Sequence, residues 1–189
     1  MNEARDAMSV AADEPHEARS GSTAAAAFQA LADEHLDAAY RLARVILRDQ
    51  AEAQDATHDA FVQAWRRWST LRDPDRFEAW FDRILVNACK DRLRRTNRTI
   101  ARDISDELEI ATPDPYTRTH ERDAIEQALA TLSADHRVVV ALRFDRDLTT
   151  DEIARRLDVP VGTVSSRLHY ALRKLHEAIT LASPEESNR

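Results

Sequence analysis

The sequence predicts an all-α protein of two small helical domains joined by a flexible acidic linker, the second a four-helix domain that ends in a helix-turn-helix. Of its 189 residues only two are glycine, and a chain so poor in glycine favours helices over tight turns and sheet. Apolar residues recur at steps of three and four along most of the chain. The stretch from Thr149 to Leu175 has the pattern of two short helices separated by a tight turn.

Composition narrows the class of protein. A single cysteine, Cys89, excludes an internal disulfide and a multi-cysteine metal cluster, and its apolar surroundings predict a buried, inert thiol. Apolar runs are too short to span a membrane, and the N-terminus lacks the pattern of a signal peptide. We therefore expect a cytoplasmic protein without membrane insertion.

Charge is distributed unevenly. The net charge is −7, yet residues 83–102 carry seven cationic side chains against Asp91 alone. Residues 1–39 hold eight acids against two arginines, and residues 103–123 hold seven against two. This distribution indicates one surface that contacts phosphate and acidic segments that contact basic partners or mimic nucleic acid. Solvated faces remain the alternative for each acidic segment taken singly.

The first domain is predicted to occupy residues 25–98, after a disordered tail over residues 1–24. Phe61, Ala64, Trp65 and Trp68 are expected to face its core. The domain should contain three helices and one polar loop with an Asp-Pro step: helices over 28–46, 52–68 and 77–98, and the loop over 69–76.

The second domain is predicted over residues 121–182, between a linker at 99–120 and a tail at 183–189. Ser133 is placed to cap a helix that runs through Phe144. Thr149 and Glu152 form a capping box, which should start the first helix of the helix-turn-helix. Pro160 and Gly162 mark the turn.

The second helix of this motif is expected to begin near Thr163 and to have two different faces. Its apolar positions should face inward: Val164, Leu168, Ala171, Leu172, Leu175 and Ile179. The opposite face has donors, an aromatic ring and cations, as a major-groove reader requires. Its members are Thr163, Ser165, Ser166, Arg167, His169, Tyr170, Arg173 and Lys174.

The long helix over 77–98 changes character along its length. Phe77 and Trp80 lie near its start, followed by a polar and cationic series that suits base and phosphate contacts: Arg83, Asn87, Lys90, Arg92, Arg94, Arg95 and Arg98. This combination suits opening a duplex as well as docking on it. Core packing is the favoured alternative for the two aromatic rings, and a solvated helix end is the alternative for the arginines.

Asp55 and Asp59 stand four residues apart and should share one helix face. Acids at this spacing suit a basic partner helix. A catalytic pair is the rival interpretation, but no nucleophile motif or metal-ligand spacing accompanies them. We therefore expect no catalytic role, no metal and no cofactor.

Three stretches, taken together and in this order, resemble the signature regions of extracytoplasmic-function (ECF) sigma factors. They are QAEAQDATHDAFVQAWRRW, RFEAWFDRILVNACKDRLRR and LSADHRVVVALRFDRDLTTDEIARRLDVPVGTVSSRLHYALRKL. The resemblance implies a two-domain subunit that associates with core RNA polymerase, recognises promoter DNA and helps to melt it. A free-standing helix-turn-helix regulator with an N-terminal dimerisation or sensor domain is the alternative, although a sensor has no need of the Asn/Arg-rich helix.

The resemblance also implies roles for individual residues. Polymerase docking would fall to Asp55, His58, Asp59 and Phe61. Recognition and melting of the minus-ten element would fall to Trp80, Arg83, Asn87, Lys90, Arg94 and Arg95, with Ser69, Arg72, Asp73 and Arg76 of the loop that captures a flipped base. Positions 165, 166, 169 and 170 would read the minus-thirty-five element.

Several residues depart from the family pattern. In the docking helix, His58 stands where glutamine is usual, and Ala56 and Thr57 replace a larger apolar pair. In the second domain, Ser165 stands where a basic residue is frequent and Tyr170 where arginine is frequent. The minus-thirty-five preference is therefore expected to be unusual or less dependent on charge. The acidic linker resembles the family segment that threads toward the active-site cleft, with a simple tether as its alternative, and the family implies regulation by an anti-sigma factor.

Overall fold

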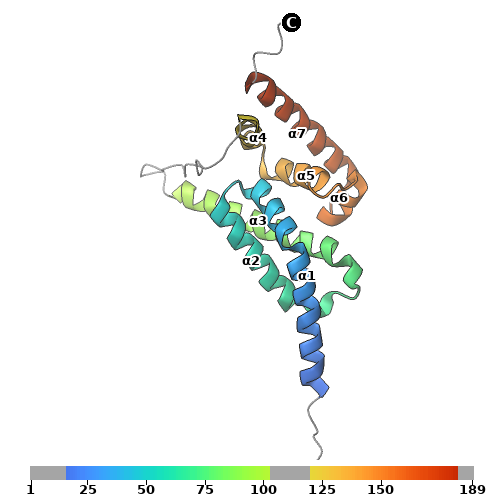
Figure 1. The fold of residues 1–189 in the computed structure, drawn as a ribbon. Coiled ribbons are helices and arrows are strands. Elements are labelled where there is room, and N and C mark those ends of the chain that lie inside the picture. Colours follow the sequence, from blue (N-terminus) through green and yellow to red (C-terminus); the bar gives the residue numbers. More distant parts are fainter. Residues whose placement is uncertain (1–15, 103–119, 183–189) are drawn as a thin grey trace, which may run out of the picture. The chain divides into compact units, whose positions relative to one another are not determined.

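The computed structural model describes residues 16–102 and 120–182, and within these ranges all regular structure is helical (Figure 1). Residues 1–15, the linker over 103–119 and the tail over 183–189 lie outside the described residues. The described chain divides between Glu34 and His35. The part before this boundary is a single helical segment, and all the other elements belong to the part that follows.

The first helix, α1, runs His16–Leu47, so the end of the predicted N-terminal tail, from residue 16, is helical. Arg48 follows with φ 61°, which ends the helix. Asp49 then caps α2, Gln50–Arg66, by accepting a 2.7 Å hydrogen bond from the backbone N–H of Glu52. The cap explains why α2 begins two residues before the predicted start.

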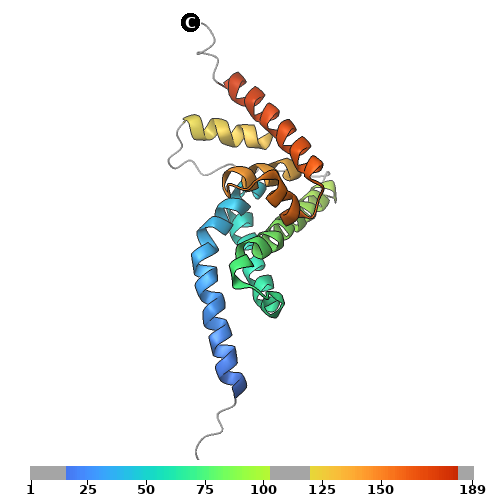
Figure 2. The ribbon, with the colours of Figure 1, turned by 90° about the vertical axis from the view of Figure 1, so that its right-hand side faces the viewer.

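Two short 3-10 turns, η1 (Trp68–Thr70) and η2 (Pro74–Arg76), occupy the predicted loop and lead into α3, Phe77–Arg102. Helices α2 and α3 lie side by side in both views (Figure 1, Figure 2). Phe81 stacks on Phe61 at 4.4 Å and on Phe77 at 5.5 Å between ring centroids. These rings, with buried aliphatic residues of α1 and α3, form the core of this helix group.

The predicted inward position of Trp65 is wrong, since the residue is 45% exposed. Helix α2 instead buries a stripe of small residues: Ala53, Ala56, Thr57, Ala60 and Ala64. Each residue turns the helix by about 100°, so a side chain one position beyond Ala64 points away from the stripe. The small side chains allow α2 to approach its neighbours closely.

The second helix group comprises α4 (His120–Ala130), α5 (Ala134–Phe144), α6 (Thr150–Leu157) and α7 (Val161–Ala182). The predicted cap of α5 is confirmed, because the hydroxyl of Ser133 accepts from the backbone N–H of His136. Helix α7 packs against the other three (Figure 2). Val138, Leu142 and Ile153 of this group are fully buried.

The apolar stripe of α7 is buried only along its centre. Val164, Leu168 and Ala171 are buried as predicted, whereas Leu172 and Ile179 are exposed and were assigned to the core wrongly. At about 100° per residue, Leu172 and Ile179 lie roughly 80° and 60° around the helix from Val164. Both lie toward one edge of the stripe, beyond the face that packs against the other helices.

Candidate polymerase and nucleic-acid interfaces

The predicted helix-turn-helix is present and is held by local backbone chemistry. Thr149 and Glu152 form the predicted capping box: the Thr149 hydroxyl accepts from the Glu152 N–H at 3.3 Å, and the Thr149 N–H donates to the Glu152 carboxylate at 2.8 Å. Hydrogen bonds from the Thr149 side chain and backbone lower the pKa of Glu152. Asp158, in the left-handed region at φ 55° and ψ 50°, ends α6. Helix α7 then begins at Val161, two residues before the predicted start.

Most of the predicted groove-facing residues of α7 are accessible. Ser165, Ser166, His169, Tyr170 and Arg173 are exposed, and Thr163 and Lys174 are half-buried. A continuous polar row therefore lies on the second helix of the motif. Its members combine hydroxyl, imidazole, phenol and guanidinium groups, which bind base edges and phosphates.

Arg167 does not join this row. Its guanidinium lies 2.8 Å from Oδ2 of Asp135, and its side chain is only 25% exposed. Oδ1 of the same carboxylate lies 2.8 Å from Nζ of Lys90 in α3. The hydrogen bond from Lys90, with the charges of both cations, lowers the pKa of Asp135 against the effect of burial. Two predicted DNA-binding cations thus share one carboxylate that the sequence interpretation did not single out.

Tyr170 belongs to a stack that the sequence interpretation also missed. Its ring lies 4.7 Å from the His136 ring and 5.3 Å from the guanidinium carbon of Arg173. Nδ1 of His136 is 2.9 Å from the Ser133 hydroxyl. Burial and the neighbouring Arg167 lower the pKa of His136, which favours the neutral form of its ring. The stack fixes the direction in which the phenol of Tyr170 points.

The predicted minus-ten residues of α3 divide into exposed and packed positions. Arg83, Asn87, Arg94 and Arg95 are exposed. Trp80 is half-buried, with its ring 6.0 Å from that of Phe77. Phe77 is buried in the core, as the favoured alternative predicted. The exposed members offer one amide and several cations, which suit a base edge and phosphates respectively.

The loop before α3 is exposed but ordered by its own hydrogen bonds. Ser69, Arg72, Asp73 and Arg76 are all exposed. The Asp73 carboxylate accepts from the backbone N–H of Asp75 at 3.1 Å and lies 3.4 Å from Nε of Arg76. These contacts hold the polar side chains of the loop next to the start of α3.

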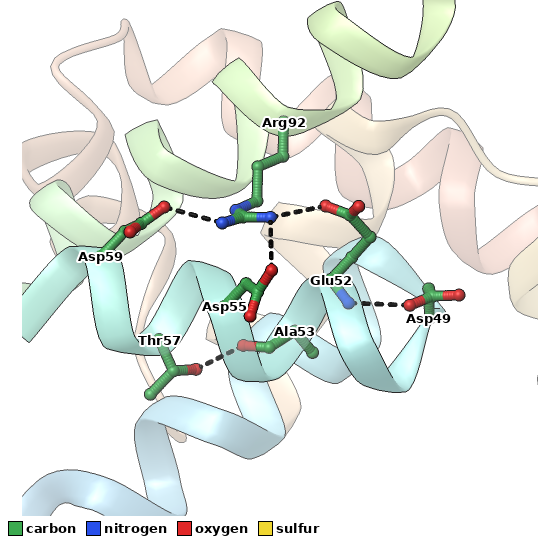
Figure 3. A network of polar contacts seen from close by, with 7 residues as sticks. All are labelled: Asp49, Glu52, Ala53, Asp55, Thr57, Asp59 and Arg92. Carbon is green, nitrogen blue, oxygen red and sulfur yellow. Dashed lines mark hydrogen bonds and ion pairs between the residues drawn. The ribbon is translucent and has the colours of Figure 1, made fainter.

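The acidic face of α2 contains a cation from a neighbouring helix. Arg92 of α3 donates to Glu52 at 2.9 Å, to Asp55 at 3.3 Å and to Asp59 at 2.7 Å (Figure 3). Burial alone would lower the pKa of Arg92, but the hydrogen bonds to Glu52 and Asp59 outweigh it and raise the pKa further. Three carboxylates against one guanidinium leave this face negative. The sequence predicted Asp55 and Asp59 on this face but not Glu52, and it assigned Arg92 to the series that suits base and phosphate contacts, whereas its guanidinium binds the carboxylates of α2.

A groove of about 340 Å³ lies beside the acidic face, between α1 and α2. Its lining includes Leu36, Tyr40, His58 and Phe61. His58 is exposed, whereas Phe61 is half-buried against Phe81. The predicted polymerase-docking residues therefore lie around an acidic rim with an apolar groove next to it.

Two further features bear on the class of protein. The Cys89 thiol is buried, and burial raises its pKa to about 12, as expected of an inert thiol. None of the helices in the described ranges combines the length and apolar character needed to cross a membrane. Across those same ranges, no group of three or more His, Cys, Asp or Glu side chains is arranged to hold a metal ion.

Two family models match the chain, Sigma-70 region 2 over residues 31–99 and Sigma-70 region 4 over residues 128–177. The ECF RNA polymerase sigma factor SigL of Mycobacterium tuberculosis is 36% identical over 155 residues, which cover 80% of this chain and 88% of that protein. The RNA polymerase sigma-E factor of Streptomyces coelicolor is 31% identical over 144 residues, covering 76% and 80% respectively.

Two solved structures have the same fold as this chain. The sigma factor RpoE of Bartonella quintana, solved with the anti-sigma factor NepR, has the same fold with a TM-score of 0.68 at 23% identity, over 82% of this chain and 97% of that one. CnrH, solved with the cytosolic domain of CnrY, has a TM-score of 0.61 at 27% identity over 85% and 96%. A region 2 match over the first helix group does not favour a free-standing helix-turn-helix regulator. The chain belongs to the ECF sigma factors, the subunits that give RNA polymerase its promoter specificity.

Proposed function

We propose that three surfaces of this sigma factor have separate roles in transcription initiation. The acidic face of α2 with its groove binds core RNA polymerase, α3 with the loop before it binds and opens the minus-ten element, and α7 reads the minus-thirty-five element. The observation that carries the proposal is the exposed polar row of α7, on the second helix of a capped helix-turn-helix.

For polymerase docking, the support is charge and exposure. The side chains of Asp55 and Asp59 are 68% and 50% exposed although both contact Arg92. Their outer oxygens are thus accessible to a second cation, and the apolar groove offers area for a basic, amphipathic helix. Arg92 holds the two carboxylates in place before the partner arrives.

For the minus-ten element, Asn87 is the residue proposed to contact a base. It lies one helical turn from Arg83 and two turns from Arg94, so all three share one side of α3. Arg83, Lys90, Arg94 and Arg95 would bind phosphates, and the loop residues Ser69, Arg72, Asp73 and Arg76 would receive an unstacked base. Trp80 would serve as a wall behind that base.

For the minus-thirty-five element, Ser165, Ser166, His169 and Tyr170 would contact bases, while Thr163, Arg173 and Lys174 would bind phosphates. Arg167 would join them once its contact with Asp135 is released. With hydroxyl and phenol groups at positions 165 and 170, the reader depends less on cations than one with arginine at these positions.

Regulation by an anti-sigma factor is part of the proposal. RpoE of Bartonella quintana was solved with the anti-sigma factor NepR, and CnrH with the cytosolic domain of CnrY. The acidic and polar surfaces described above offer a target for such a partner here. Because core RNA polymerase acts in the cytoplasm, the chain is expected there as well.

Co-purification with core RNA polymerase tests the docking surface. The charge reversal Asp55→Lys with Asp59→Lys should reduce retention on core enzyme, since it removes both exposed acids beside Arg92. Asp33→Lys with Glu34→Lys, at two exposed acids of α1, matches the change in charge and should leave retention unchanged. Equal retention of the two double variants, both with native circular dichroism, would remove the α2 face from the docking surface.

A further inference from the structure

A buried carboxylate joins the two helix groups. Asp82 lies in α3 and is 1% exposed. Burying a carboxylate without a partner is strongly unfavourable. Its partners come from the second helix group: Arg146, between α5 and α6, donates to Oδ1 at 3.1 Å, and Arg156 of α6 hydrogen-bonds Oδ2. Glu78, one turn before Asp82, lies 3.6 Å from Arg146 and 3.5 Å from Arg156.

This cluster, Glu78, Asp82, Arg146 and Arg156, balances two acids against two cations. The side chains of Arg146 and Arg156 are largely buried by the contact. Asp82 is 64 residues from Arg146 and 74 from Arg156 along the chain, so no local helix structure requires the pairing. All four groups are charged, and each is well hydrated when the helix groups separate. The cluster is therefore a contact between charged groups that water can hydrate when it opens.

Two further polar contacts also join the helix groups. Arg137 of α5 donates from Nε to the carbonyl of Ile46 at 2.7 Å, in the last turn of α1, where helix carbonyls lack an internal partner. Asp135, at the start of α5, accepts from Lys90 of α3 while also binding Arg167 of α7. The second helix group thus contacts both α1 and α3 through polar groups.

The contact between the helix groups also pairs a proposed DNA-binding cation. Lys90 of α3 lies 2.8 Å from Asp135 of α5, a carboxylate that Arg167 of α7 contacts within the second helix group. Arg146 Nε is also buried with no hydrogen-bond partner within the described ranges, which weakens the closed contact by a desolvation penalty. Such a contact is suited to release when another partner is available.

We propose that Glu78, Asp82, Arg146 and Arg156 form an intramolecular latch that closes the helix-turn-helix group onto α3 and withholds Lys90 from promoter DNA in the free subunit. The inference rests on the proposed function, because it takes Lys90 to be a DNA contact. Opening the latch is then a step that precedes promoter binding. Removing latch residues should raise the affinity of the free chain for DNA.

Zero-length carbodiimide crosslinking of the full chain measures the closed state directly. Lys90 Nζ and Asp135 Oδ1 are 2.8 Å apart, so wild type should give a peptide pair joined at these residues in mass spectra. Arg146→Ala with Arg156→Ala should reduce that product by about fivefold or more, as expected when the closed population falls. Arg155→Ala, at the exposed neighbour of Arg156 in α6, is the matched control and should crosslink like wild type.

Fluorescence anisotropy with a promoter duplex then measures the affinity of the free chain for DNA. Asp82→Asn, which keeps both arginines, should bind DNA without polymerase about tenfold more tightly than wild type, in line with the population shift. The arginine double variant serves if Asp82→Asn fails to fold. An unchanged crosslink in that double variant overturns the latch, and a lost crosslink with unchanged DNA affinity overturns the withholding of Lys90. Transcription by wild type with core enzyme reports separately on the proposed function.

Discussion

Replacing Arg92 by methionine removes the one cation that holds three carboxylates of α2, while most of the aliphatic stem is retained. The guanidinium makes contacts of 2.9, 3.3 and 2.7 Å with Glu52, Asp55 and Asp59, and its side chain is 18% exposed. A hydrogen bond to a charged group contributes about 1.5–3 kcal/mol when buried. Because the carboxylates are roughly half exposed, solvent screening reduces the total, and we expect a loss of about 1–2 kcal/mol in the free energy of unfolding.

Urea denaturation followed by circular dichroism measures this loss. Arg94→Met is the matched control, since Arg94 lies on the same helix and pairs with neighbouring Asp91 at 2.8 Å, with both side chains largely exposed. We expect the control to change the free energy of unfolding by about 0–0.5 kcal/mol. The loss at Arg92 should shrink partially in high salt. Equal effects of the two substitutions would refute the role assigned to the Arg92 cluster.

Three other predictions concern single side chains. Cys89, buried and with a pKa of about 12, should react with iodoacetamide at pH 8 orders of magnitude more slowly in the native chain than in urea, because the thiolate fraction is only about one in ten thousand; similar rates would contradict its burial. Thr149→Ala should lower the free energy of unfolding by about 1 kcal/mol through loss of the capping box, whereas Thr150→Ala should not; calorimetry compares the two. Tyr170→Ala should weaken discrimination at one minus-thirty-five base by about 1–3 kcal/mol, measured by transcription from substituted promoters, and an unchanged preference would exclude Tyr170 from the reader.

Local chemistry accounts for what the sequence predicts well. The caps at Ser133 and Thr149 require only residues three positions apart, and both are present. Periodicity likewise locates the helices, because an amphipathic helix has to bury its apolar stripe whatever it packs against. Periodicity is less reliable at the edges of a stripe, where Trp65 and Leu172 turn out to be exposed. The partner helix, and not the helix itself, determines how wide the buried face is.

Local spacing and periodicity do not predict ion pairs between residues far apart in the sequence. Arg92 is 40 residues from Glu52, and Asp82 is 74 from Arg156. In the sequence each of these residues is one more charge on an amphipathic helix. Only the packing of α3 against α2 and α6 brings the partners together. Packing of α5 against α3 and α7 likewise explains why Lys90 and Arg167, predicted to be available for DNA, both contact Asp135.

Transcription reconstituted from purified core RNA polymerase, this chain and genomic fragments tests the central claim most directly. We expect transcripts that start at a small set of sites sharing minus-thirty-five and minus-ten elements, that appear only when the chain is added, and that are lost with Asp55→Lys and Asp59→Lys. Identical transcripts with and without the chain, under conditions in which a known sigma factor supports initiation by the same core enzyme, would contradict it.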